Sequence, residues 1–186
     1  MADLLDRLRV SLPPCLSASA SGLVAGILHL AIPTNRFVSR FNHDVMPTCP
    51  FCPAPDTVFH FFTECSRLLP LFSLLQTLLG KLGFLFNHNL FVSSVRYTKG
   101  RKGECTLANF LFGQAKLAIY KTHKTEMEEG NGKDLVGVFK TMVRTRVAAD
   151  FAYLKMTDEL LFFNQRWCIG GAICSVDSTD GISFRF

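Results

Sequence analysis

The feature that most constrains this chain is the cysteine-rich stretch of residues 49–65, which reads C-P-F-C-P-A-P-D-T-V-F-H-F-F-T-E-C. It contains Cys49, Cys52, His60 and Cys65 with the spacing C-x2-C-x7-H-x4-C. Two cysteines three positions apart can bind one ion from a tight turn, and a histidine and a third cysteine on a following helical turn or loop can complete a tetrahedron. We therefore predict a Zn²⁺ site with these four ligands. The alternative is a knuckle of buried thiols beside a chance histidine.

The residues between these ligands favour a structural site. Pro50, Pro53 and Pro55 stiffen the first half of the stretch and prevent a helix there, as expected for a turn held by a metal. The apolar residues on both sides of the histidine could cover the site; they are Val58, Phe59, Phe61 and Phe62. Four protein ligands leave no position for an activated water, so zinc here would stabilise the fold and not perform catalysis.

The cysteine count places the chain in a reducing compartment. Seven cysteines are an odd number, which excludes a complete disulfide framework. Four lie outside the predicted metal site, show no ligand spacing and are interpreted as reduced thiols: Cys15, Cys105, Cys168 and Cys174. No run of about eighteen apolar residues is present, so no membrane association is expected. We predict an intracellular protein of the nucleus or cytoplasm.

Hydrophobic periodicity predicts a mainly α fold, with a small CCHC zinc-binding module followed by a helical bundle-like region. We expect four parts: a divergent N-terminal segment (1–24), a helix pair plus the CCHC module (25–69), a helical domain (70–167) with a basic segment (96–124), and a flexible tail (168–186).

Individual helices are predicted where apolar residues recur at helical spacing. The expected ranges are 1–10, 23–32, 35–41, 70–82, 104–125, 134–156 and a last helix that ends at residue 167. Thr34 should cap the third of these, with Phe37, Val38 and Phe41 facing inward. Thr157 or Asp158 should cap the last. Residues 84–95 fit either an extended segment or a helix.

Positive charge is concentrated in residues 96–124, where seven Lys/Arg and one Asp/Glu give +6, against +5 for the whole chain. Such a block is either a solvated face or a phosphate-binding surface. Tyr97 among basic residues resembles the stacking platforms of single-strand binders. The candidate nucleic-acid-binding residues are Arg36, Arg40, Arg67, Arg96, Tyr97, Lys99, Arg101, Lys102, Lys116, Lys121 and Lys124.

Several segments together resemble a known family. They are H-L-A-I-P-T-N-R-F (29–37), C-P-F-C, T-V-F-H-F-F-T-E-C, N-F-L-F-G-Q-A-K-L-A-I-Y (109–120), M-V-R-T-R (142–146) and W-C-I-G-G-A-I-C-S (167–175). They are similar to the zinc-binding region that follows the polymerase domain of non-LTR (LINE-type) retrotransposon reverse transcriptases. The resemblance covers about residues 27–176 and implies the same four metal ligands and a position near template RNA or target DNA.

The chain also departs from that family. It contains no Asp-Asp pair, and Asp44, Asp56 and Asp150 are isolated, whereas two-metal nucleotidyl transfer needs clustered carboxylates. Residues 1–24 do not match, as expected for a degraded copy or a spliced host exon. A Cys105–His123 pair is the one hint of an enzyme, and nothing in the sequence orients it. We therefore expect no catalytic activity and interpret the chain as a remnant or fragment.

Two functions from different classes remain open. The first is a zinc-binding, nucleic-acid-binding remnant of a reverse transcriptase, with single-stranded or template RNA, or DNA, as partner. The second is a zinc-stapled helical domain with a structural or protein-interaction role, in which the basic segment is a solvated face. No protein partner can be named from the sequence.

Overall fold

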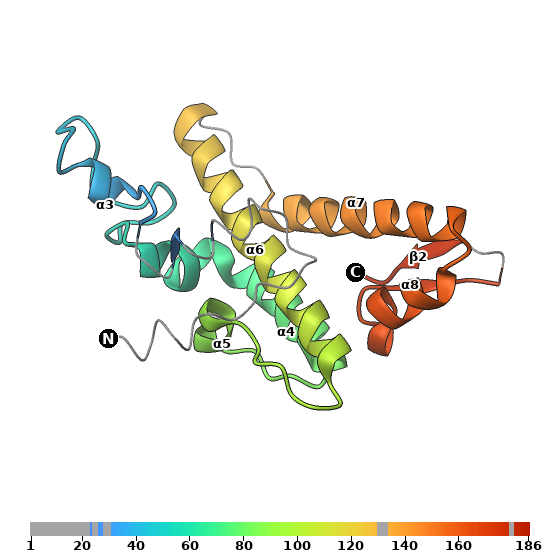
Figure 1. Ribbon diagram of the computed structural model, residues 1–186. Coiled ribbons are helices and arrows are strands. Elements are labelled where there is room, and N and C mark those ends of the chain that lie inside the picture. The colour runs from blue at the N-terminus through green and yellow to red at the C-terminus, as the bar shows by residue number, and fades with distance from the viewer. Residues whose placement is uncertain (1–22, 24–25, 28–30, 130–133, 179–180) are drawn as a thin grey trace.

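The computed structural model describes residues 23, 26–27, 31–129, 134–178 and 181–186 (Figure 1). The predicted helix at 1–10, Cys15 and all of the N-terminal segment except Leu23 lie outside the described residues. Of the helix predicted at 23–32, the described Leu23, Ile27 and Ile32 are buried.

Three helices form the frame of the molecule: α4 (Leu69–Lys81), α6 (Lys102–Glu129) and α7 (Leu135–Met156). Pro70 favours the start of α4. Asp134 caps the start of α7, where its carboxylate accepts from Val136 N–H at 3.0 Å. In Figure 1, α6 runs through the centre, with α4 beside its lower half and α7 leading away to the right. The mainly α fold and the three long helices are confirmed.

Shorter elements complete the chain. They are α3 (Asn35–Val38), the π-helical turn η1 (His60–Glu64), the 3-10 turn η2 (Ser66–Leu68), α5 (His88–Ser93), α8 (Leu160–Trp167), the 3-10 turn η3 (Ile169–Gly171), β1 (Cys174–Val176) and β2 (Ile182–Phe184). Helix α5 resolves the ambiguous range 84–95 in favour of a helix with flanking loops.

The core lies between α4, α6, α7 and α8 and is built from leucine and aromatic side chains. Phe91 of α5 meets Phe112 of α6 edge to face, with ring centroids 5.5 Å apart, and both rings are fully buried. Phe110 of α6 contacts Trp167 of α8 in the same way at 4.8 Å. Large rings packed edge to face join these helices, so this part of the chain has an ordinary apolar core.

The C-terminal tail differs from the expectation. Residues 168–186 were expected to be flexible, but β1 and β2 pair antiparallel with Ser175 opposite Ser183. Residues 172–174, A-I-C, have no exposed surface, so a short apolar run anchors a segment whose composition is rich in Gly and Ser. Gly170 has a positive φ of 59°, and a Cβ there would lie 2.6 Å from the Lys81 carbonyl oxygen. Glycine therefore allows the tail to pack against the end of α4.

The face of the third predicted helix was also assigned wrongly. Thr34 caps α3 as expected, accepting from Phe37 N–H at 3.4 Å. However, Phe37 and Phe41 are 47% and 77% exposed, whereas Thr34 and Asn35 are buried. Polar contacts of Asn35 with the cysteine-rich loop determine which face turns inward, and helical periodicity carries no information about such contacts.

Two smaller corrections concern the last helix. Its N-cap is Glu159, which makes no side-chain capping bond, and neither Thr157 nor Asp158 caps it. Thr157 instead donates its hydroxyl to the Glu159 carboxylate at 3.0 Å. Among the described helices, none combines the length and the apolar content that crossing a bilayer requires.

Candidate metal centre

A short hairpin positions the first two cysteines. Thr48 and Pro55 form an isolated antiparallel bridge, and Cys49 N–H donates to the Ala54 carbonyl at 2.8 Å. The prolines between these positions cannot donate backbone hydrogen bonds, so the chain reverses as a tight turn. The turn directs the thiols of Cys49 and Cys52 toward the same point, as the C-x2-C spacing predicts.

The other two ligands come from a π-helical turn, η1. Cys65 N–H donates to the His60 carbonyl at 3.0 Å, a bond from residue i+5 to residue i. In an α-helix, residues five apart differ by about 500°, which would leave the two side chains about 140° apart around the axis. The wider π turn brings them to one side, and such turns are frequent at functional sites. The sequence predicted that these residues converge but did not predict the π geometry.

The four side chains converge closely. Their ligand atoms all lie within 4.8 Å of one another. Cys49 Sγ and Cys65 Sγ are 3.8 Å apart, and Cys52 Sγ is 3.2 Å from His60 Nε2. For tetrahedral zinc with Zn–S of about 2.3 Å and Zn–N of about 2.1 Å, we expect about 3.8 Å between sulfurs and about 3.6 Å between sulfur and nitrogen. The sulfur–sulfur distance fits, and the sulfur–nitrogen distance is slightly short. The arrangement can hold a metal ion.

The thiols of Cys49 and Cys65 are electrostatically coupled. The contact with Cys65, together with burial, raises the pKa of Cys49, and the same contact lowers the pKa of Cys65. One thiol of this pair therefore holds its proton and donates it to the other sulfur. Phe51 N–H also points at Cys49 Sγ, at 3.5 Å, the type of backbone contact that stabilises a metal-bound thiolate. A divalent ion would supply the positive charge that both thiolates require.

The site is mostly closed to water. Cys49, His60 and Cys65 are buried and Cys52 is half-buried. Of the apolar residues expected to cover the site, Phe61 and Phe62 are 3% and 1% exposed and Val58 is half-buried. The expectation is wrong for Phe59, which is 53% exposed.

Buried polar residues that the sequence analysis did not connect attach this loop to its neighbours. The Asp56 carboxylate has no exposed surface, accepts from Asn35 N–H at 2.7 Å and lies 3.6 Å from His123 Nε2 of α6. Asn35 also donates its side-chain amide to the Thr48 carbonyl at 3.0 Å. Asp56 was noted only as an isolated carboxylate. Its position between three prolines and the histidine was the available signal, because an acidic residue in such an apolar stretch needs a buried partner.

The structure gives no support for a catalytic pair of Cys105 and His123. His123 lies against Phe61, with ring centroids 4.1 Å apart, and its Nε2 lies 3.6 Å from the Asp56 carboxylate. The Cys105 thiol instead donates to the Arg96 carbonyl at 3.4 Å. The two side chains therefore have separate structural partners.

Arg67 also joins the cysteine-rich stretch of residues 49–65, which we call the metal loop, to α6. Its guanidinium lies over the Phe51 ring at 3.8 Å and donates to the Ile119 carbonyl at 3.0 Å. The residue is half-buried. These contacts attach the Cys49–Cys52 turn to the helix, so Arg67, a predicted phosphate contact, has a mainly structural role.

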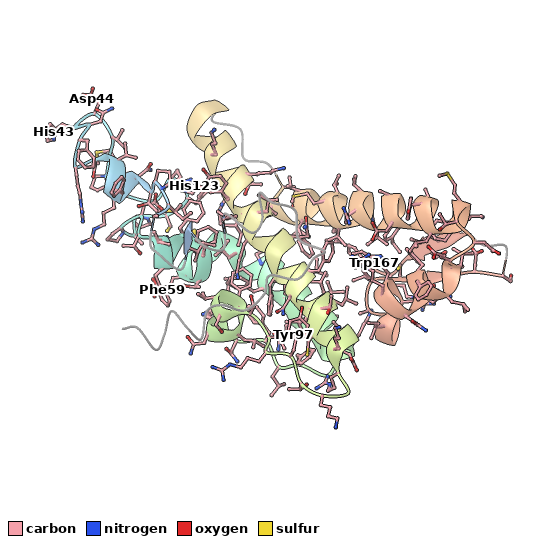
Figure 2. All side chains as sticks on the ribbon, viewed as in Figure 1. His43, Asp44, Phe59, Tyr97, His123 and Trp167 are labelled. Carbon is pink, nitrogen blue, oxygen red and sulfur yellow. The ribbon has the colours of Figure 1, made fainter. Side chains whose placement is uncertain are left out.

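The remaining basic candidates lie on three parts of the described chain. Arg36 and Arg40 belong to the arm around α3, beside the tip that carries His43 and Asp44. Arg96, Tyr97 and Lys99 are exposed on the loop before α6, and Lys102 is exposed at the first residue of α6. Figure 2 places Tyr97 far from that tip. Lys121 and Lys124 are exposed on α6. The basic segment 96–124 and the arginines near the metal ligands therefore belong to different parts of the described chain.

Two of the predicted contacts have structural roles. Arg101 donates to the Leu82 carbonyl at 2.6 Å beyond the end of α4 and lies over the Phe84 ring at 4.4 Å. Lys116 was expected on the outer face of α6, and this is wrong: it is 1% exposed, and its ammonium donates to the Val92 carbonyl at 3.0 Å. Burial lowers the pKa of Lys116 to about 7. Helical spacing misplaced Lys116 because α5 covers that side of α6.

The chain is similar to one curated protein of Xenopus laevis described as "Transposon TX1 uncharacterized 149 kDa protein". The two are 33% identical over 159 residues, which are 86% of this chain and 12% of that protein. No protein-family model and no solved structure matches the chain. The similarity therefore relates most of this chain to a short part of a transposon protein.

Proposed function

We propose that the chain is a zinc-binding and nucleic-acid-binding segment of a retrotransposon reverse transcriptase, without the polymerase active site. The observation that carries the proposal is the convergence of Cys49, Cys52, His60 and Cys65 at distances suited to one tetrahedral ion. Three thiols and an imidazole match the preference of Zn²⁺ over Mg²⁺ or Ca²⁺, which prefer oxygen ligands. The similarity to a transposon protein adds independent support.

Metal content tests the first half of the proposal. Native mass spectrometry of the purified chain should show one zinc per chain, and the double variant Cys49→Ser/Cys52→Ser should show none. Cys168→Ser is the matched control, because Cys168 is a half-buried thiol outside the cluster, and it should keep one zinc. Stoichiometric zinc in the double variant would refute the ligand assignment.

The exposed basic loop supports the nucleic-acid half. Lys99 and Lys102 lie within five residues of Tyr97 in the sequence, and all three side chains are exposed, Tyr97 by 38%. If these lysines contact phosphates, Lys99→Ala/Lys102→Ala should lower the slope of log K against log salt by about 1.4 for a single strand, at about 0.7 per contact. Filter binding over a salt series measures this slope. Arg101→Ala is not suitable here, because it would also remove the bond to Leu82.

No polymerase activity is expected from the described residues. Among them, one group of three or more potential metal ligands is found, the Cys/His cluster itself. Asp150 lies 3.2 Å from Arg146 and 3.1 Å from Arg166, so its carboxylate is already neutralised by two cations. We expect no template-dependent primer extension by the purified chain. Incorporation that is lost in Asp150→Asn would contradict this expectation.

The alternative is a zinc-stapled structural or protein-interaction domain. Exposed apolar side chains near the junction of α7 and α8 favour it: Tyr153, Met156, Leu161 and Phe162 are all more than 60% exposed. On this alternative, oligonucleotide binding would be absent or independent of salt. The salt series therefore discriminates between the two functions.

A further inference from the structure

The arm that carries α3 contains a tandem Arg-Phe repeat, Arg36-Phe37 and Arg40-Phe41. Although α3 ends at Val38, hydrogen bonds continue the helical turn: Ser39 N–H donates to Asn35 O at 2.8 Å and Asn42 N–H to Val38 O at 3.0 Å. Residues four apart in a helical turn lie on one face, with a rise of about 6 Å. The two phenylalanines therefore follow each other along one stripe, and the two arginines along the neighbouring stripe.

Both aromatic rings face solvent. Phe37 and Phe41 are 47% and 77% exposed, and their centroids are 5.5 Å apart with an interplanar angle of 61°. In an edge-to-face pair, one ring uses its edge and the other one face, so further ring faces stay open. Two adjacent exposed rings on one short arm are unfavourable in water unless they meet a partner.

The charges of the arm indicate the chemistry of that partner. Arg36 and Arg40 are exposed, and neither forms an ion pair with any carboxylate of the described residues. Flat rings beside unpaired cations are the combination that holds single-stranded nucleic acid, because bases stack on rings while phosphates meet the cations. In a duplex the base faces are already occupied, so it can offer only its phosphates to this surface.

The metal loop fixes the base of the arm. Asn35, the residue before the first Arg-Phe pair, donates its backbone N–H to Asp56 and its side-chain amide to Thr48. Thr48 directly precedes the ligand Cys49, so the arm is attached to the loop that the metal closes. A stacking surface gains affinity when it is preorganised in this way.

We propose that Phe37 and Phe41, with Arg36 and Arg40, form a stacking platform for single-stranded nucleic acid, held in place by the metal loop. This inference rests on the proposed function and deepens it, since it assigns base stacking to the arm and not to the loop around Tyr97.

The test uses the zinc-loaded full chain and a 2-aminopurine-labelled 12-nucleotide strand, as RNA and as DNA, with the matching duplex. Binding to the parent chain should quench the probe, because 2-aminopurine loses fluorescence when it stacks. Phe37→Ala/Phe41→Ala should bind the single strand at least about 5- to 150-fold more weakly, the loss of one stacked base, with an unchanged salt slope and weaker quenching. Phe37→Leu/Phe41→Leu should show the same loss of single-strand affinity and the same weaker quenching as the alanine variant, since leucine keeps the apolar surface but has no ring face.

Two further variants separate charge and general surface effects. Arg36→Gln/Arg40→Gln should lower the single-strand salt slope by about 1.4. Tyr153→Ala/Phe162→Ala removes two equally exposed rings from α7 and α8 and should bind like the parent. Zinc content and melting temperature should stay at parental values in all variants, because none of the replaced side chains is buried.

Each outcome has a distinct meaning. If the parent chain binds neither strand nor duplex, the proposed function fails. If the parent binds and Phe37→Ala/Phe41→Ala binds equally well, the platform is refuted while the proposed function stands. An equal loss of duplex affinity, or the loss of a protein partner without loss of oligonucleotide affinity, also refutes the platform.

Discussion

The metal module (residues 34–65) and the helical frame of α4, α6 and α7 are stabilised by different means. The frame buries many leucine and aromatic side chains completely, among them Leu75, Phe112 and Phe139. The module buries few large apolar residues apart from Phe61 and Phe62, and it exposes more of them: Phe37, Phe41, Met46 and Phe59 are 47–77% exposed.

This difference indicates what each region depends on. Fully buried apolar side chains stabilise the frame through the hydrophobic effect, at about 25 cal/mol per Å² of apolar surface removed from water. The module buries fewer apolar side chains, so we expect its stability to depend on metal binding by the converging Cys/His side chains and on buried polar contacts such as that of Asp56 with Asn35. Metal removal should therefore destabilise mainly the module, and core mutation mainly the frame.

The largest expected effect is the loss of the metal from the module. Structural zinc contributes about 10–16 kcal/mol of apparent binding free energy in small zinc-binding peptides near pH 7, so Cys52→Ser should unfold residues 34–65. Amide hydrogen exchange should show lost protection at the π-helical turn and in α3. The frame should keep its slowest amides, since its core does not involve the ligands.

Chelation of the parent chain is the matching control. A zinc chelator should reproduce the exchange pattern of Cys52→Ser, and added Zn²⁺ should reverse it in the parent only. Uniform loss of protection across α4, α6 and α7 would show that the two regions are not separable, and would contradict the comparison.

A core truncation should give the converse result. Leu75→Ala in α4 removes a fully buried side chain and should lower the free energy of unfolding of the frame by about 2–5 kcal/mol. Below the melting transition of this variant, zinc stoichiometry should stay at one. Leu85→Ala is the control, because Leu85 is 89% exposed and its truncation should change stability by less than about 0.5 kcal/mol. Denaturant unfolding followed by circular dichroism measures both.

Lys116 provides a pH-dependent test inside the frame. Its pKa falls from 10.5 to about 7 on folding because of burial. Below pH 7 both folded and unfolded chains hold the proton, and the folded chain bears the full cost of the buried charge. Between pH 7 and 10.5 the folded chain alone loses the proton, so this group makes stability rise with pH. The shift corresponds to at most about 5 kcal/mol.

Lys116→Met removes the buried charge but also the hydrogen bond to the Val92 carbonyl. At pH 6 the variant should therefore raise the free energy of unfolding of the frame by a net of about 1–3 kcal/mol. The variant should also lose the rise in stability above pH 7. Urea unfolding at pH 6, 7.5 and 9 tests this prediction. Equal pH slopes in parent and variant would show that the ammonium is not desolvated in the folded chain.

The sequence was most informative where one physical rule decides the structure. Apolar periodicity over α4, α6 and α7 predicted these helices, because a long amphipathic pattern allows few other folds. Ligand spacing likewise predicted which four side chains converge. The C-x2-C turn is a local geometry, and His60 and Cys65 are close enough in the chain for one π turn to join them.

The errors arose where tertiary contacts override local patterns. The outward face of Phe37 and Phe41 follows from the bonds of Asn35 to residues 13 and 21 positions away. The burial of Lys116 follows from the position of α5 over α6, which the ambiguous range 84–95 left open. The tail hairpin depends on three buried residues within a Gly- and Ser-rich segment. No single-sequence pattern contains these long-range pairings.

The smallest expected effect concerns the contact of α7 with α8, far from the metal. Asp150 accepts from Trp167 Nε1 at 3.2 Å and pairs with Arg146 and Arg166, whose side chains are 47% and 38% exposed. Solvent screens these ion pairs, and the amide oxygen of asparagine can still accept from the indole. Asp150→Asn should therefore lower the free energy of unfolding by about 1 kcal/mol or less. Asp150→Ala should cost about 1–3 kcal/mol, because it leaves the buried indole N–H without a partner. Thermal unfolding at low and high salt separates the ion pairs from the indole hydrogen bond. Added salt should reduce the difference in melting temperature between the parent and Asp150→Asn, but not the difference between Asp150→Asn and Asp150→Ala.

Zinc content should be unchanged in both variants, and loss of zinc in either would show that the frame and the metal module are coupled through α7.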